Sequence, residues 1–88
     1  MSTDDSESDI QAYQAELIEY LLSRRSPDAM DAALDSLLTP AEYTEISKRL
    51  QIFKLLNAGV PHRKIAEQLG VGIATVSRGS RALNQQDQ

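Results

Sequence analysis

The 88-residue chain contains no cysteine, one histidine and no long apolar run. Without cysteine it can form no disulfide framework, no thiol nucleophile and no cysteine-based zinc site. No apolar stretch approaches the ~20 residues that a membrane-spanning helix needs, and the acidic start MSTDDSESD does not resemble a secretory signal. We therefore expect one small cytoplasmic domain, and a chain this short gains from sharing its core with a second copy.

The net charge of −4 is unevenly distributed along the chain. Residues 1–47 hold eleven Asp or Glu and two Arg, a net charge of −9. Residues 48–83 hold seven Lys or Arg against Glu67 alone, a net charge of +6, and Asp87 supplies the last −1. A local basic excess is typical of a phosphate-binding face, although such clusters also occur as solvated helix faces.

Apolar periodicity predicts an all-α chain of about five helices, without strands or internal repeats. By composition, residues 1–8 are predicted to be a disordered acidic tail. The first helix is expected from about Asp9 to Arg24, and its wide apolar stripe favours burial against a second subunit. Ser26 and Pro27 are predicted to be the N-cap and first residue of the next helix. The inner face of that helix is expected to hold Met30, Ala33, Leu34, Leu37 and Leu38.

Residues 39–42, Thr-Pro-Ala-Glu, predict the start of a third helix. Thr39 can cap the N–H of Glu42, and the Glu42 carboxylate can bond back to Thr39. This helix is expected to end near Ala58-Gly59, and its apolar side is expected to carry Ile46, Leu50, Phe53 and Leu56. At the end of the chain, residues 84–88 after Leu83 are predicted to be a polar tail.

Residues 61–82 have the pattern of a helix-turn-helix, two short helices joined by a tight glycine turn. Pro61 is expected to open the first helix, whose inner face holds Ile65 and Leu69. Gly70 should end it in the left-handed conformation that favours glycine.

The second helix of this motif is expected to start at about Ile73. Val71 and Val76 should point into the wedge between the two helices, and the small Ala66 should let them cross closely. Side chains near the front of the second helix suit a DNA groove: Ile73, Ala74, Thr75, Ser77 and Arg78.

Two segments, LTPAEYTEISKR (38–49) and GVGIATVSRGSRAL (70–83), resemble the bacterial tryptophan operon repressor family. The resemblance covers roughly residues 38–83, and GIATVSRGS is its most specific part. It implies an intertwined, all-helical homodimer whose two recognition helices enter successive major grooves of a palindromic operator. It also implies transcriptional repression with L-tryptophan as the corepressor.

The resemblance implies a role for each residue of the ligand site. Arg78 would pair with the ligand carboxylate, and the planar guanidinium of Arg49 would lie against the indole ring. Thr39 and Gly79 would line the pocket, and the carbonyls of Ser36 and Leu38 would face the ligand ammonium group.

On the DNA side, Arg63 matches the family arginine that reaches a guanine edge, where bidentate contact to O6 and N7 suits arginine. Short groove-facing side chains remain compatible with base contacts through water. The predicted DNA-binding residues are His62, Arg63, Gly72, Ile73, Ala74, Thr75 and Ser77.

Three features depart from the family pattern. Ala82 replaces a serine that helps to bind the ligand amino group, and the turn at Val60-Pro61-His62 is one residue shorter. The family usually continues with one more helix after the position of Leu83.

Three other functions are alternatives to this prediction. The first is a regulator of the same fold with a different effector or none, and the second is a protein-interaction module that keeps the motif as a scaffold. An enzyme is the least expected, because His62 has no cysteine or carboxylate pair beside it. Gly70-Val71-Gly72 lacks the third glycine and the preceding strand of a phosphate-binding fingerprint. No metal or cofactor site is expected.

Overall fold

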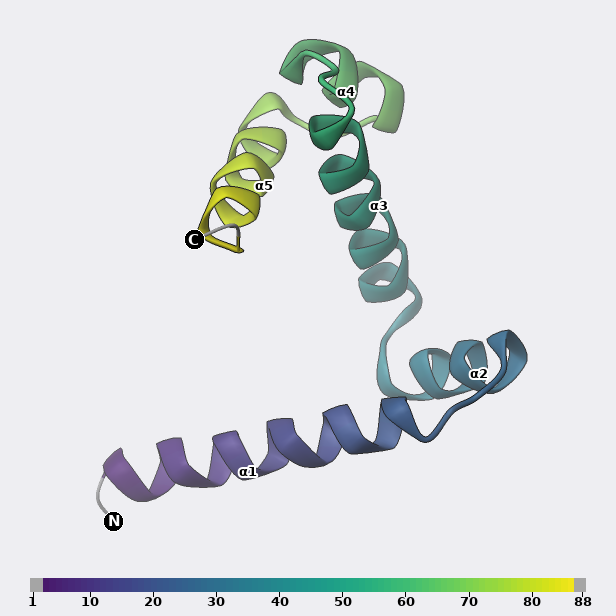
Figure 1. Cartoon of the computed structure of the whole chain (residues 1–88), viewed down its shortest axis with the longest axis vertical. Helices are drawn as coiled ribbons and strands as arrows, with labels where there is room; N and C mark the ends of the chain where they lie inside the picture. Colours follow the sequence, from purple (N-terminus) through teal and green to yellow (C-terminus); the bar gives the residue numbers. More distant parts are fainter. Residues whose placement is uncertain (1–2, 87–88) are drawn as a thin grey trace. The chain divides into compact units, whose positions relative to one another are not determined.

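The computed structural model describes residues 3–86, which form five α-helices and no strand. They are α1 (Thr3–Leu22), α2 (Pro27–Leu37), α3 (Pro40–Asn57), α4 (His62–Leu69) and α5 (Ile73–Gln86) (Figure 1). The predicted all-α fold of about five helices is confirmed. The chain divides into two units, Met1–Thr39 with α1 and α2, and Pro40–Gln88 with α3, α4 and α5.

The first and last helices both extend further than the apolar periodicity predicts. α1 begins at Thr3, so residues 3–8 of the expected disordered tail are helical. α5 continues to Gln86, so residues 84–86 of the expected polar tail form its last turn. A formed helix gains one hydrogen bond for each residue that it adds, so it can continue into polar residues. Composition alone does not predict this extension. Residues 1, 2, 87 and 88 of the two tails lie outside the described residues.

The link between α1 and α2 is fixed by side chains at both helix ends. The Ser23 hydroxyl donates to the Tyr20 carbonyl over 2.6 Å, which occupies an acceptor left free at the end of α1. The Arg24 guanidinium lies 4.4 Å from the centre of the Tyr20 ring, within the range of a cation–π contact. At the start of α2, Ser26 Oγ accepts a hydrogen bond from the Ala29 N–H over 3.1 Å, which confirms the predicted N-cap.

The predicted inner face of α2 is only partly covered within its own unit. Ala33 is buried, Met30 and Leu34 are half-buried, and Leu37 is exposed. Leu38 is the C-cap, with an extended backbone and its N–H bonded to the Leu34 carbonyl. Leu37 therefore lies exposed at the end of the helix, whereas Leu38 is half-buried.

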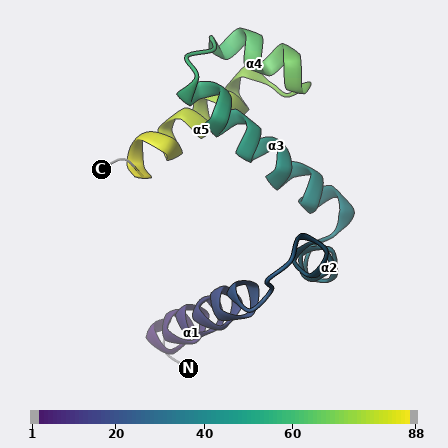
Figure 2. The same cartoon turned by 45° about the vertical axis from the view of Figure 1, so that its right-hand side comes forward.

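In the second unit, α3, α4 and α5 pack against one another, with α4 following the end of α3 and preceding the start of α5 (Figure 2). Around the buried core lie Leu55, Leu56, Val60, Leu69 and Val71, which are partly buried. The core itself consists of Ile52, Ile65, Ala66 and Val76. The predicted inward positions of Ile65, Ala66, Val71 and Val76 are confirmed.

The apolar side of α3 differs from its predicted composition. Ile46 and Leu50 are exposed, whereas Ile52, which was not among the predicted inner residues, is buried. Phe53 and Leu56 are half-buried. The core residues of α3 all belong to its second half, because this is where the other two helices of the unit pack.

Two glycines with positive φ end α3 and α4. At Gly59 (φ 83°), the Gly59 and Val60 N–H groups bond to the carbonyls of Leu56 and Leu55, the pair of bonds that defines a Schellman motif. At Gly70 (φ 67°), the Val71 N–H bonds to the Ala66 carbonyl over 3.0 Å. Both glycines supply a left-handed residue that other side chains disfavour, as predicted for Gly70.

Candidate nucleic-acid interface and ligand cleft

The two motif helices are joined by a three-residue turn that is held by backbone bonds. Pro61 is the N-cap of α4, with an extended backbone, and its carbonyl accepts from the Ile65 N–H. The Gly72 carbonyl accepts from the Thr75 N–H over 3.1 Å, which begins α5 at Ile73. Ile65 and Val76 are completely buried between the helices, so apolar side chains fill the wedge of the motif.

The predicted DNA-binding residues lie at the starts of the two motif helices. His62 and Arg63 are exposed in the first turn of α4. Gly72, Ile73 and Ala74 are exposed, and Thr75 and Ser77 are half-buried. Ile73 exposes 52% of its surface although it is a large apolar side chain, which leaves it available to a thymine methyl group in a groove.

A shallow hollow of about 540 Å³ lies beside these predicted DNA-binding residues, and we call it the DNA-side hollow. It brings His62, from the start of α4, together with Ala74 and Ser77 of α5. Arg63 is exposed beside His62 but does not line the hollow. The other lining residues are Arg78, Ser80 and Arg81.

Ser80 and Arg81 are additions to the predicted interface. Arg81 follows Ser77 by four residues, so the two side chains lie on one face of a helix. Two features of the sequence could have indicated Arg81: its spacing from Ser77 and its contribution to the local basic excess. Residues 61–82 carry Arg63, Lys64, Arg78 and Arg81 against Glu67 alone, and this charge favours contact with phosphates.

A second hollow, of about 320 Å³, lies between α3 and α5, and we call it the α3–α5 cleft. It brings together three residues predicted to bind the ligand: Arg49 from α3, and Arg78 and Gly79 from α5. Ala82, the departure from the family pattern, also lines it. The remaining lining residues are Glu45, Ile52, Phe53 and Thr75.

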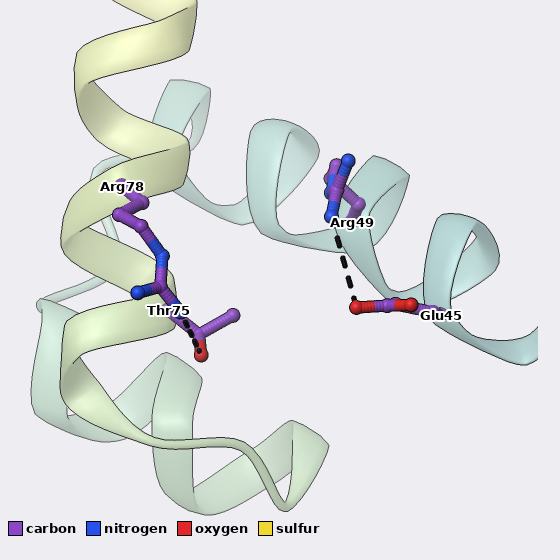
Figure 3. Close-up of polar contacts among 4 residues, drawn as sticks. All are labelled: Glu45, Arg49, Thr75 and Arg78. Atoms are coloured by element: carbon purple, nitrogen blue, oxygen red, sulfur yellow. Dashed lines mark hydrogen bonds and ion pairs between the residues drawn. The ribbon is translucent and has the colours of Figure 1, made fainter. Parts of the chain in front are cut away.

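Two polar contacts lie along the edges of the cleft (Figure 3). On α5, Arg78 Nη2 donates to Thr75 Oγ1 over 3.3 Å. On α3, Arg49 Nη2 lies 3.8 Å from Glu45 Oε1, with both side chains more than half exposed. Exposed pairs of this kind stabilise a protein by less than about 1 kcal/mol, so a ligand could displace them at little cost.

Gly79 of α5 lies close against Ile52 of α3. It is buried, and a Cβ atom at this position would lie 2.8 Å from Ile52 Cγ2. Glycine therefore lines the cleft and also permits the helix packing that forms it.

Ser36, Leu38 and Thr39 belong to the first unit, so their predicted role toward the ligand remains a prediction. The Ser36 hydroxyl donates to the Ala33 carbonyl over 2.8 Å within α2. Glu45 was absent from the predicted site, although its spacing from Arg49 places both on one face of α3.

Two further properties concern the described residues as a set. None of the helices within residues 3–86 has the length and apolar character needed to cross a membrane. The described side chains also include no group of three or more His, Asp or Glu that could hold a metal ion.

Comparison with known proteins identifies the family. The family model described as Trp repressor protein matches residues 13–88. A Trp operon repressor homolog from Photobacterium profundum is 37% identical over 98% of this chain and 84% of its own length. Homologs from Xylella fastidiosa and Vibrio parahaemolyticus are 38% and 35% identical over 81% and 77% of this chain, and 76% and 67% of their own lengths. No solved structure matches the chain significantly.

These matches agree with the all-helical layout of the described residues. The family is regulatory and not enzymatic, and the relatives are named as repressors. The chain therefore belongs to the Trp repressor family of transcriptional repressors.

Proposed function

We propose that this repressor binds a palindromic DNA operator as a homodimer and requires L-tryptophan, held in the α3–α5 cleft, to bind it tightly. The observation that carries the proposal is the position of Arg78. Its side chain lines both the α3–α5 cleft and the hollow on the DNA-binding side of α5. One guanidinium can therefore respond to a ligand and influence the surface that meets DNA.

The cleft has the chemistry that a small aromatic amino acid needs. Its volume of about 320 Å³ is at the lower end of the range for small-molecule sites. Arg78 offers a fork of N–H donors to a carboxylate, and Arg49 offers a planar guanidinium to an aromatic ring. Phe53, Ile52 and Gly79 supply an apolar wall.

The ligand would act through the orientation of α5. Arg78 donates to Thr75 over 3.3 Å, and Thr75 is also one of the residues proposed to face the DNA groove. A carboxylate that binds Arg78 changes the contacts of this turn of α5. DNA affinity then rises only if the ligand binds more tightly to the conformation that fits the operator.

The DNA-facing surface supports groove binding by small side chains flanked by basic ones. Ala74, Ser77 and the exposed Ile73 would lie in the groove, and Arg63 would read a guanine edge. Arg81 extends the basic edge beyond this set.

The proposed dimer accounts for the exposed apolar surface of α1. Large apolar side chains of this helix stay exposed in the single chain, among them Ile10, Tyr13, Leu17, Ile18 and Leu22. A second copy could cover them, and dimerisation is general in the family. Two recognition helices would then meet two half-sites, as the two-fold symmetry of a palindrome requires.

The experiment begins with selection of DNA from a random duplex pool in the presence of L-tryptophan. Affinity for the selected site is then measured with and without L-tryptophan at one fixed salt concentration, since DNA affinity falls steeply with salt. We expect L-tryptophan to tighten binding at least about tenfold, within the usual 5–150-fold range of allosteric coupling. L-Leucine serves as the control ligand.

Three arginine variants separate the two surfaces. Arg49→Ala alters the cleft and leaves the hollow on the DNA-binding side of α5 unchanged, so it should lose the response to L-tryptophan. Arg81→Ala alters only the DNA-side hollow, so it should weaken binding with and without L-tryptophan by the same factor. Arg78→Ala alters both and should lose the response while remaining folded. A normal response in Arg78→Ala would contradict the assignment of the site.

The runner-up is a repressor of the same fold with a different effector or none, and Ala82 in the cleft favours it. Tight binding to a selected operator that is independent of L-tryptophan would support this alternative. No DNA binding even at low salt would instead support a protein-interaction module.

A further inference from the structure

We infer that Glu45 is a specificity-determining residue of the α3–α5 cleft, which selects effectors that carry an ammonium group. The inference rests on the proposed function of the cleft as an effector site. It adds a residue that the family resemblance did not assign and a criterion for the ligand that the site accepts.

Glu45 is the one acidic residue among those that line the cleft. It also lines an adjoining hollow of about 230 Å³, which extends toward the turn before α5 and includes Lys48 and Gly72. Arg49 and Thr75, like Glu45, line both the cleft and this adjoining hollow. The carboxylate therefore lies where the two spaces meet, among side chains proposed to bind the ligand.

The contacts of Glu45 leave it available to a ligand. Its carboxylate Oε1 lies 3.8 Å from Arg49 Nη2, and 69% of its side chain is exposed. A pair at this distance and exposure contributes little to folding, so structural stability alone gives a weak reason for a carboxylate here. Figure 3 shows Glu45 and Arg49 on successive turns of α3, opposite Arg78 on α5.

The charges of the cleft complement an amino acid rather than a simple carboxylic acid. An amino acid has one carboxylate and one ammonium group, and the cleft offers guanidinium donors and one carboxylate acceptor. Ala82 offers only a methyl group at its own position and cannot accept a hydrogen bond from the ammonium. An ammonium has three N–H donors, so Glu45 can accept one of them.

The same carboxylate acts against ligands that lack the ammonium group. A deaminated analogue brings its own carboxylate into the cleft and leaves Glu45 without a cationic partner on the ligand. Discrimination of this kind combines attraction to one ligand with repulsion of another. Neutral glutamine at position 45 keeps the shape of the side chain and removes both effects.

The test compares L-tryptophan with indole-3-propionate, the same molecule without its amino group, by calorimetric titration of the full chain. We expect the wild type to prefer L-tryptophan by at least about tenfold. Glu45→Gln should reduce this preference to about twofold or less, because it weakens the binding of L-tryptophan and strengthens the binding of indole-3-propionate. Glu67→Gln, the same change at an exposed carboxylate of α4, should leave the preference unchanged. Circular dichroism checks that each variant is folded.

The possible failures are distinguishable. If the wild type binds L-tryptophan but Glu45→Gln keeps the full preference, the role of Glu45 is overturned and the effector site stands. If Glu67→Gln lowers the preference as much as Glu45→Gln, the effect is one of overall charge and the inference is also overturned. If the folded wild type binds neither ligand, the proposed corepressor fails, and the inference fails with it.

Discussion

Gly79 of α5 and Ile52 of α3 are so close that a Cβ atom on Gly79 would lie 2.8 Å from Ile52 Cγ2. Ile52 is almost completely buried, and its Cγ2 methyl is fixed by branching at Cβ, so it cannot rotate away without disturbing the core. Both residues line the α3–α5 cleft, so this contact brings its two helices close together.

Gly79→Ala should therefore destabilise the protein and weaken ligand binding. Alanine favours a helix over glycine by about 1 kcal/mol, but overpacking a core typically costs about 1–3 kcal/mol. We expect a net loss near 1 kcal/mol in the free energy of unfolding by urea, measured at one protein concentration. Gly72→Ala is the control, because a Cβ atom there meets nothing within 4 Å. Equal or greater stability of Gly79→Ala would contradict the close contact.

Arg63→Ala should relax sequence specificity at one base pair of each half-site. If Arg63 contacts a guanine edge, its loss should cost about 1–3 kcal/mol on the optimal site and much less on sites already changed at that position. Binding to a panel of single-base variants of the selected operator measures this difference. A uniform loss on all sequences would show that Arg63 contacts phosphate instead.

Arg81→Ala should show the opposite behaviour, because we expect Arg81 to contact the backbone from the edge of the DNA-side hollow. Affinity should fall by a similar factor for every duplex, and the dependence of log K on log salt should become shallower by about one for each arginine removed. Titrations over a range of salt concentrations determine the slope. Lys54 is exposed on α3 and lines neither the α3–α5 cleft nor the DNA-side hollow, so Lys54→Ala should leave the slope unchanged.

Ala82→Ser should tighten binding of L-tryptophan by adding a hydroxyl to the wall of the cleft. One intramolecular-type hydrogen bond contributes about 0.5–1.5 kcal/mol, so we expect about a two- to tenfold lower Kd in calorimetry. Ala58→Ser, an exposed alanine that does not line the cleft, is the matched control. Weaker binding by Ala82→Ser would show that the ligand amino group does not face this position.

The features that depend on a few neighbouring residues were predictable from the sequence. The left-handed Gly70, the Ser26 N-cap and the buried positions of Ile65 and Val76 each follow from local backbone or periodicity rules. Arg49 and Arg78 line the same cleft, and the family resemblance had indicated that they lie near each other.

Features that depend on which surfaces meet were harder to predict. Periodicity along α3 did not reveal that only its second half is covered by the other helices, so Ile46 was expected inside and Ile52 was missed. Glu45 was missed for a similar reason, since an exposed carboxylate four residues before an arginine is usually a surface pair. Its relevance follows from the position of α5 across the cleft, which is a tertiary property.

The central claim is that the α3–α5 cleft binds L-tryptophan, and direct fluorescence titration tests it most simply. The chain has no tryptophan of its own, so indole emission excited beyond the tyrosine band comes from the ligand alone. We predict a saturable change in emission with one L-tryptophan bound per subunit, which Arg78→Ala abolishes. Absence of saturable binding to the folded wild-type protein would contradict the account.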